Sequence, residues 1–494
     1  MDSAPLMFDT DTRHQETGGC RMPATKGGRR SADAVRGSRP TKTATGLPPS
    51  PDELHAAGRA LRERVPRSEH SGWKPPKNRR DPVEMVTQSS KGRIPQLVPI
   101  RYGRMAASPL AFYRGTANIM AADLASTRVT GIHAQLCGDC HALNFNGFAT
   151  PERRVIFDLA DFDQTLPGPW EWDVKRLAVS LILAARSNGF PRSVQRDTAL
   201  TCVRRYREHL AEYAGMAVLD VWYASVDEQA FVAGLRERDA AAALTRRIEK
   251  VAARHLGNDR FPKMIAAAGR YTIADEPPLI FHHPYLNMTT ARHDVLEAFA
   301  QYRDALPHDR QVLLDRYRLM DISAKVVGIG SVGTVCAVIL LMAAEDDFLF
   351  LQVKQAAPSV LEPYVKKSAY SAHGQRVVVG QRLMQSASDI FLGWCKSRSH
   401  HYYVRQLRDM KIAPRIDRMD PVTLVDYAGM CGWTLARAHA RSADSAMIAG
   451  YLGRGNRFDK AVARFASAYA DQAERDYKAF MRAVRDGRIE VRDG

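Results

Sequence analysis

Three carboxylates and an asparagine have the types and spacing of a metal-dependent phosphoryl-transfer site. Asp139 stands five residues before Asn144, and Asp161 and Asp163 follow an apolar segment at 155–159. In phosphoryl transfer one carboxylate accepts the proton of the attacking hydroxyl, while an asparagine and a second aspartate hold the metal. Mg²⁺ prefers oxygen ligands and takes few of them from the protein. We therefore predict Asp139 as a catalytic base, with Asn144, Asp161 and Asp163 as metal ligands.

The surrounding segment, CGDCHALN at 137–144, allows other interpretations. We predict His141 as a second catalytic residue, but Asp and Asn are also common turn formers. The Cys-x-x-Cys-His string fits c-type haem attachment, which requires export, and the acidic N-terminus lacks the apolar core of a signal peptide. A zinc site requires a second cysteine pair at zinc spacing, which does not follow. Asp158 and Asp173 are expected to be structural, as a strand-end polar group and a helix N-cap.

A glycine-rich stretch in the second half, GIGSVGTV at 328–335, predicts a phosphate-binding loop. A dinucleotide fold would continue with a helix. Here the apolar β-branched run 335–341 follows, so the loop joins two strands, as in hairpins that cover nucleotide phosphates. A plain hairpin with glycines at bulges is the alternative. We predict nucleotide binding by Gly328, Gly330, Ser331, Gly333 and Lys354, the last at the end of the next strand, with Glu362 as the acidic partner of Lys354.

The elements that must position these residues divide the chain into four parts. Pattern and composition indicate a disordered or loosely ordered basic tail, a helical catalytic lobe, a β-rich nucleotide-binding lobe and closing helices that complete the helical lobe. The predicted ranges are 1–93 for the tail with one short helix at 52–65, 94–318 for the catalytic lobe, 319–412 for the β-rich lobe and 413–494 for the closing helices.

Composition narrows the class of protein. The 494 residues are 45% hydrophobic, which is enough for a buried core. The formal net charge of +17 suits an enzyme that attracts anions, and no long Lys/Arg block lies in the body of the chain. We therefore do not expect nucleic acid as the main partner. Seven cysteines are too few and odd for a disulfide framework. No apolar run of about 18 residues exists to span a membrane, so we expect a cytoplasmic protein without a membrane partner.

Several longer strings resemble the bacterial family catalogued as domain of unknown function 2252. The resemblance runs from about Arg101 to Gly487 and includes the Gly138 and Gly328 segments and the strings 108–115, 168–173, 380–382, 403–407 and 438–442. The catalytic segments also resemble the aminoglycoside phosphotransferase and protein-kinase superfamily, whose pattern is His-Gly-Asp-x-His-x-x-Asn and then a hydrophobic strand ending in Asp. Cys137 replaces the first His. By position, this resemblance implies the same roles for Asp139, Asn144 and Asp161, and a structural role for Asp173.

The order of the motifs is reversed, because Asp139 precedes Gly328. The resemblance therefore implies an α+β, two-lobed, protein-kinase-like fold in circularly permuted order, with the strand at 402–407 as the hinge. We expect a Mg-ATP-dependent phosphotransferase that acts on an unknown small-molecule acceptor. The alternatives are a pseudokinase-type nucleotide-binding regulator, a metal-dependent phosphohydrolase that uses Asp161 and Asp163 without ATP, and a basic nucleic-acid adaptor. The sequence predicts no oligomeric state.

Overall fold

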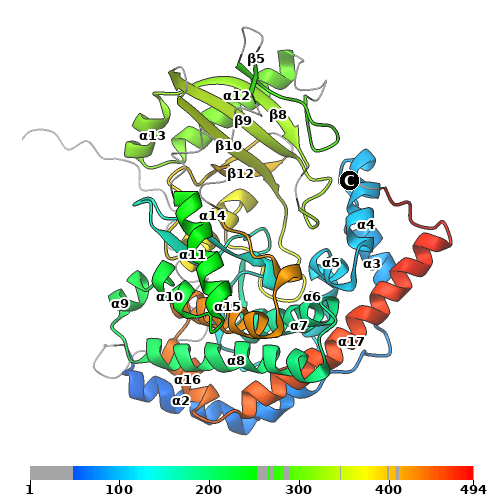
Figure 1. Ribbon diagram of the computed structural model, residues 1–494, viewed down its shortest axis with the longest axis vertical. Coiled ribbons are helices and arrows are strands. Elements are labelled where there is room, and N and C mark those ends of the chain that lie inside the picture. The colour runs from blue at the N-terminus through cyan, green and yellow to red at the C-terminus, as the bar shows by residue number, and fades with distance from the viewer. Residues whose placement is uncertain are drawn as a thin grey trace, which may run out of the picture.

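The computed structural model describes residues 48–252, 265–267, 271–282, 289–326, 328–344, 347–397, 400–407 and 411–492. The expected mixed α+β class is confirmed. Most helices gather at one end of the molecule and the largest sheet lies at the other (Figure 1).

The helical part is organised around four long helices that share one core. They are α7 (Glu171–Ser187), α8 (Arg192–Ala214), α15 (Pro421–Ala440) and α17 (Arg457–Arg485). The apolar spacing of α7 predicts a buried face, and its Leu177 and Leu181 are fully buried. Shorter helices complete this part: α2 (Pro51–Arg64), η1 (Arg67–Ser71), α3 (Pro82–Gln88), η2 (Pro95–Leu97), α4 (Val98–Ala106), α5 (Pro109–Arg114), α6 (Ala117–Leu124), η3 (Ala142–Asn144), α9 (Val218–Tyr223), α10 (Glu228–Ala233), α11 (Arg238–Ala252), η7 (Ile416–Arg418) and α16 (Ser445–Leu452).

Two antiparallel strand pairs rest on this helical core. They are β1 (His133–Leu136) with β4 (Leu166–Pro169), and β2 (Phe145–Ala149) with β3 (Val155–Leu159). The end of β1 pairs with the start of β4, and the start of β2 pairs with the end of β3. The β1–β2 loop at 137–144 and the β3–β4 loop at 160–165 are therefore tied together at both of their ends.

The largest sheet has six strands in the order β11-β12-β10-β9-β8-β7, and all of its neighbouring strands pair antiparallel. The strands are β7 (Ile280–Phe281), β8 (Arg318–Lys325), β9 (Cys336–Ala344), β10 (Asp347–Ala356), β11 (Gly393–Lys396) and β12 (His401–Gln406). The glycine-rich stretch joins β8 to β9, so the predicted hairpin is confirmed. The helix α14 (His373–Met384) lies between β10 and β11 in the chain, and a separate pair is formed by β5 (Ile265–Ala267) and β6 (Tyr271–Ile273).

The sheet has its own apolar core, which extends into residues that we assigned to the helical lobe. Tyr302 and Leu306, in and just after α12 (Thr289–Asp304), pack with Ile339 and Leu341 of β9, and α13 (His308–Leu314) adds Leu314. These two helices therefore lie on the sheet. Helical periodicity shows that a face is apolar but does not show which partner covers it.

Much of the predicted tail is folded. Residues 48–93 pack against the helical part, and the helix predicted at 52–65 is confirmed as α2, which lies along α16. Arg79 shows why a polar segment is ordered here, because its guanidinium pairs with Asp123 at 2.8 Å and Asp476 at 2.6 Å. The prediction for residues 1–47 lies outside the described residues.

His70 gives a pH-dependent test of this docking. Its side chain is 1% exposed, with Nε2 2.7 Å from the Tyr451 hydroxyl. Burial, with a smaller contribution from the charge of Lys175, lowers the pKa of His70 to about 3. The unfolded chain takes up this proton below about pH 6.5 and the folded protein does not, so the unfolding free energy falls as pH is lowered from about 6.5 towards 3.

We expect His70→Gln to remove this part of the pH dependence. The difference in unfolding free energy between wild type and variant, measured with urea from about pH 7 to about pH 4, should change by roughly 1.4 kcal/mol per unit below pH 6.5. The exposed His55, changed to Gln, provides the control and should follow the wild type. A wild-type-to-variant difference that is constant across this range would contradict the assignment.

Candidate active site

A cleft with a volume of about 1510 Å³ lies between the helical part and the sheet. Pockets for a single small molecule are usually about 300–1,000 Å³, so this cleft is larger than such a pocket. Its lining includes nine of the eleven predicted site residues: Asp139, His141, Asn144, Asp161, Asp163, Gly328, Gly330, Ser331 and Lys354. The other two, Gly333 and Glu362, are not part of the lining.

The β1–β2 loop is held by Asp173. The carboxylate of this residue accepts hydrogen bonds from the backbone N–H of Cys137 at 2.6 Å and of Gly138 at 3.0 Å. Gly138 has φ +82°, and a Cβ there would lie 2.3 Å from the carbonyl oxygen of Gln164, so only glycine fits. The expected helix N-cap role of Asp173 is wrong, because Trp170 is the N-cap of α7. Asp173 instead fixes the loop that carries Asp139.

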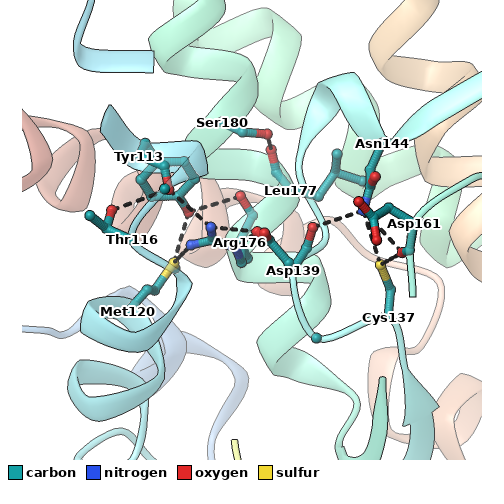
Figure 2. A network of polar contacts seen from close by, with 12 residues as sticks. Tyr113, Thr116, Met120, Cys137, Asp139, Asn144, Asp161, Arg176, Leu177 and Ser180 are labelled. Carbon is teal, nitrogen blue, oxygen red and sulfur yellow. Dashed lines mark hydrogen bonds and ion pairs between the residues drawn. The ribbon is translucent and has the colours of Figure 1, made fainter. Parts of the chain in front are cut away.

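Asp139 is oriented by a buried arginine. The Nε of Arg176 donates to Oδ1 of Asp139 at 2.7 Å, and its Nη2 donates to the carbonyl oxygen of Tyr113 at 3.0 Å. The Asp139 side chain is 23% exposed and that of Arg176 is 3% exposed. Figure 2 shows Arg176 between Tyr113 and Asp139. One oxygen of Asp139 is thus held by the protein, and the side chain still lines the cleft.

Asn144 is held in place through its amide nitrogen. Its Nδ2 donates to the carbonyl oxygens of Asp139 at 3.0 Å and Asp161 at 3.2 Å. Both acceptors are backbone carbonyls, so the amide cannot be turned around without losing them. Figure 2 shows Asn144 directly beside Asp161. The amide oxygen of Asn144 and the carboxylate of Asp161 are therefore the two candidate metal ligands that the fold places side by side.

The Asp161 carboxylate is in a setting that favours a bound cation. Burial raises its pKa and the charge of Asp163 adds to this, against the opposing effect of Lys354. Among the described residues no group of three or more His, Cys, Asp or Glu side chains could hold a metal ion. Two oxygen donors without such a group do not fit zinc, but they fit Mg²⁺, which is commonly held by one or two protein groups together with substrate phosphates.

Asp163 is the carboxylate that pairs with Lys354. The lysine Nζ lies 3.0 Å from Oδ2 of Asp163, and the hydroxyl of Ser331 donates to the same oxygen at 3.0 Å. The Tyr403 hydroxyl donates to Oδ1 at 2.5 Å. Burial opposes the charge of Asp163, but the charge of Lys354 and the hydrogen bonds from Tyr403 and Lys354 lower its pKa to about 2. Both of its oxygens are engaged, which leaves Asn144 and Asp161 as the candidate metal pair.

The structure gives Lys354 this partner in place of the predicted Glu362. The chain after β10 passes towards α14, and the charge of Glu362 acts on His373 and Arg376 of that helix. The contact between Lys354 and Asp163 joins residues 191 positions apart. A nearby acidic residue in the sequence was therefore a poor guide to the lysine's partner.

These segments belong to a region that a family profile recognises. The profile described as uncharacterized protein conserved in bacteria (DUF2252) matches residues 93–483. The chain belongs to this family. No curated protein and no solved structure matches it. In this DUF2252 chain the matched range contains all eleven predicted site residues, whereas α2 and α3 precede it. None of the described helices is long and apolar enough to cross a membrane.

The glycine-rich loop of the DUF2252 chain is held by residues that sequence reasoning missed. The carbonyl oxygen of Gly333 accepts from the backbone N–H of Ile94 at 2.8 Å, and that of Gly328 accepts from Arg104 Nη1 at 2.6 Å. Arg93 donates to the carbonyl oxygen of Val332. The φ angles of +67° at Gly328 and +85° at Gly333 explain the glycines there. Gly333 thus serves the shape of the loop.

His141 is a neutral, buried member of the cleft. Its side chain is 7% exposed, and burial lowers its pKa to about 3. Its Nδ1 is buried without a hydrogen-bond partner among the described residues. At neutral pH the ring therefore offers one N–H donor and one acceptor, and it carries no charge.

Proposed function

We propose that this protein is a Mg-ATP-dependent phosphotransferase with a two-lobed, circularly permuted kinase-like fold. The observation that carries the proposal is the meeting of Lys354, from the sheet, with the Asp161–Asp163 segment, from the helical part, in the cleft that Asp139 also lines. In protein kinases a glycine-rich loop covers the phosphates, a lysine on the third strand contacts them, and a catalytic-loop Asp, an Asn and a further Asp complete the site. The same residue types meet here from the opposite chain order.

The chain's own residues have distinct tasks in this proposal. Asp139, held by Arg176, accepts the proton of the acceptor hydroxyl as that oxygen attacks the terminal phosphorus, and ADP leaves. Lys354 and the backbone N–H groups of the loop 328–333 contact the phosphates. Asn144 and Asp161 would hold Mg²⁺, which when bound neutralises charge on the phosphates.

The ion pair of Lys354 differs from the kinase pattern in the residue that supplies its carboxylate. Kinases pair this lysine with a glutamate of a helix that follows its strand. The helix in that position here, α14, contains no acidic residue, and Lys354 pairs with Asp163. Binding of nucleotide phosphates would therefore compete with Asp163 for Lys354 and Ser331.

Thermal unfolding with and without Mg-ATP tests the proposal. A ligand that binds only the folded state stabilises it by about 2.7 kcal/mol at a hundredfold excess over Kd. We expect Mg-ATP to raise the midpoint of the wild type and Asp161→Asn to remove the metal-dependent part of the rise. Asp197→Asn provides a matched control, because Asp197 is 55% exposed and lies outside the cleft lining.

The outcomes separate the alternatives. The absence of any shift at millimolar Mg-ATP contradicts the proposal. A shift without consumption of ATP favours the pseudokinase-type regulator. Hydrolysis of phosphate esters without a response to ATP favours the phosphohydrolase.

A further inference from the structure

Arg114 is an arginine of the cleft that forms no ion pair with a carboxylate of the described residues. It is the last residue of α5, and it lines the cleft in a half-buried position. Its Nε is buried without a hydrogen-bond partner, and no ion pair joins its guanidinium to another described residue. Burial lowers its pKa, against the charges of Asp139 and Asp161, which places Arg114 within electrostatic reach of both carboxylates.

Three other arginines of the helical part, each at most 12% exposed, have carboxylate partners. Arg207 pairs with Asp459 at 2.9 Å, and Arg79 and Arg437 also contact aspartates. Such pairing is expected, because a buried charge without a counter-charge is costly. The unpaired guanidinium of Arg114 is therefore a position where a ligand anion would complete the site.

The wall around Arg114 adds positive charge. Arg101 is 1% exposed, and its hydrogen-bond partners among the described residues are neutral: the hydroxyls of Ser89 and Ser90 and the carbonyl oxygen of Gly115. Arg93 likewise donates to carbonyl oxygens. Both also line the cleft. Neutral acceptors satisfy the hydrogen bonds of a guanidinium but leave its charge in place, so this wall attracts anions.

His141 is a second side chain of the cleft with an unpaired nitrogen. It is 7% exposed, it lines the same cleft as Arg114, and its Nδ1 has no partner among the described residues. The charge of Arg114 acts on this ring across the cleft wall that both residues line. A neutral imidazole can donate one N–H to an oxyanion that a guanidinium also holds.

Arg114 lies between the glycine-rich loop and the proposed base: a Cβ on Gly330 would lie 4.0 Å from the carbonyl oxygen of Arg114. Lys354, Ser331 and Tyr403 gather around Asp163. The charge of Asp139, the proposed base that the acceptor must approach, instead acts on both Arg114 and His141. An anion at Arg114 would thus sit on the acceptor's side of the cleft.

We propose that Arg114 and His141 bind an oxyanion, a phosphate or carboxylate group, carried by the acceptor. The assignment of this oxyanion to the acceptor rests on the proposed function. The anion site itself rests only on the unpaired groups of the cleft wall. A guanidinium binds such a group through two parallel N–H···O hydrogen bonds. The acceptor class is then a small hydroxylated molecule with a phosphate or carboxylate group.

Binding of inorganic phosphate and of acetate, without Mg²⁺ or nucleotide, tests this site. The apparent Kd of each is obtained from the thermal midpoint at increasing anion concentration and constant ionic strength. We expect Arg114→Gln to weaken binding of the preferred anion by about tenfold or more. Arg114→Lys keeps the charge but not the planar fork, and should give an intermediate loss. The preferred anion identifies the group on the acceptor.

Two controls locate the bound anion. Lys354→Met removes the lysine assigned to nucleotide phosphates, and Arg464→Gln removes an exposed arginine of α17. Arg464→Gln should bind the anion as the wild type does, and Lys354→Met should lose less affinity for it than Arg114→Gln. If Arg114→Gln and Arg114→Lys bind normally while Lys354→Met does not, the anion occupies the nucleotide site and the proposal is overturned. Failure of the wild type to bind either anion also overturns it.

The two proposals fail separately. The anion titration contains no Mg-ATP, so a missing Mg-ATP shift leaves its result unaffected. A protein that binds Mg-ATP but shows no Arg114-dependent anion binding keeps the phosphotransferase proposal and loses the anionic acceptor. The thermal midpoint of Arg114→Gln without anion shows whether that variant is folded. His141→Gln should also weaken anion binding and therefore tests the same site through a second residue.

Discussion

Asp139→Asn should lower phosphoryl transfer by about 10²–10⁴-fold and leave the stabilisation by Mg-ATP unchanged. Asparagine has the size of aspartate and can present an oxygen to Arg176, which now donates to Oδ1 of Asp139 at 2.7 Å. It cannot accept the proton of the attacking hydroxyl. The loss should therefore fall on kcat and not on nucleotide binding.

The measurement is ADP release with a panel of hydroxylated phosphates and carboxylates as acceptors, beside the Mg-ATP-induced midpoint shift. Asp197→Asn, which changes an exposed carboxylate outside the cleft lining, should retain wild-type rates. Wild-type turnover by Asp139→Asn would remove Asp139 from the role of base. A loss of both turnover and nucleotide binding would instead show that Asp139 maintains the shape of the cleft.

Arg437→Leu should destabilise the protein by about 3–5 kcal/mol, the cost of leaving one member of a buried ion pair alone. The side chains of Arg437, on α15, and Asp158, on β3, are both 0% exposed. Asp158 also accepts from the backbone N–H of Ser386 at 2.8 Å and from its hydroxyl at 2.9 Å. This cluster joins α15, β3 and the segment after α14, so its loss weakens the connection between the two parts of the molecule.

Urea unfolding at neutral pH measures this effect. Arg464→Leu, a change of an exposed arginine, should stay within about 0.5 kcal/mol of the wild type. The double variant Arg437→Leu with Asp158→Asn removes the orphaned charge and should recover part of the stability. A single-variant loss below about 1 kcal/mol would show that Asp158 is compensated by Ser386 and by relaxation of its surroundings.

Local elements followed from the sequence because neighbouring residues determine them. The helix α2 begins after Ser50, whose side chain and that of Glu53 form a capping box. The strand β3 has the predicted bounds, and the β-branched run after Thr334 makes a strand and not a helix. The residue pattern at 111–125 predicts one helix, whereas the structure has two helices there, α5 and α6, which meet around Gly115.

The proximity of Asp139, Asn144 and Asp161 could also be predicted from the sequence, because all three lie on one pair of connected loops. The pairing of the strands places the two loops side by side. Leu136 pairs with Leu166 and Phe145 pairs with Leu159, which holds both loops together at their ends. A pattern of short strands around polar loops is enough to predict that such residues meet.

Contacts between distant segments were decided only by the tertiary structure. Lys354 finds Asp163 across 191 positions, and Arg62 of α2 binds the carbonyl oxygen of Tyr451 across 389. The roles of Arg176 and Arg114 likewise depend on what faces them across the cleft. Sequence by itself determined which local elements form and which chemical groups they carry, since these depend on backbone preference and apolar periodicity. Which charged groups pair, and which remain unpaired, depends on how separate segments pack, because a counter-charge acts through space and not along the chain.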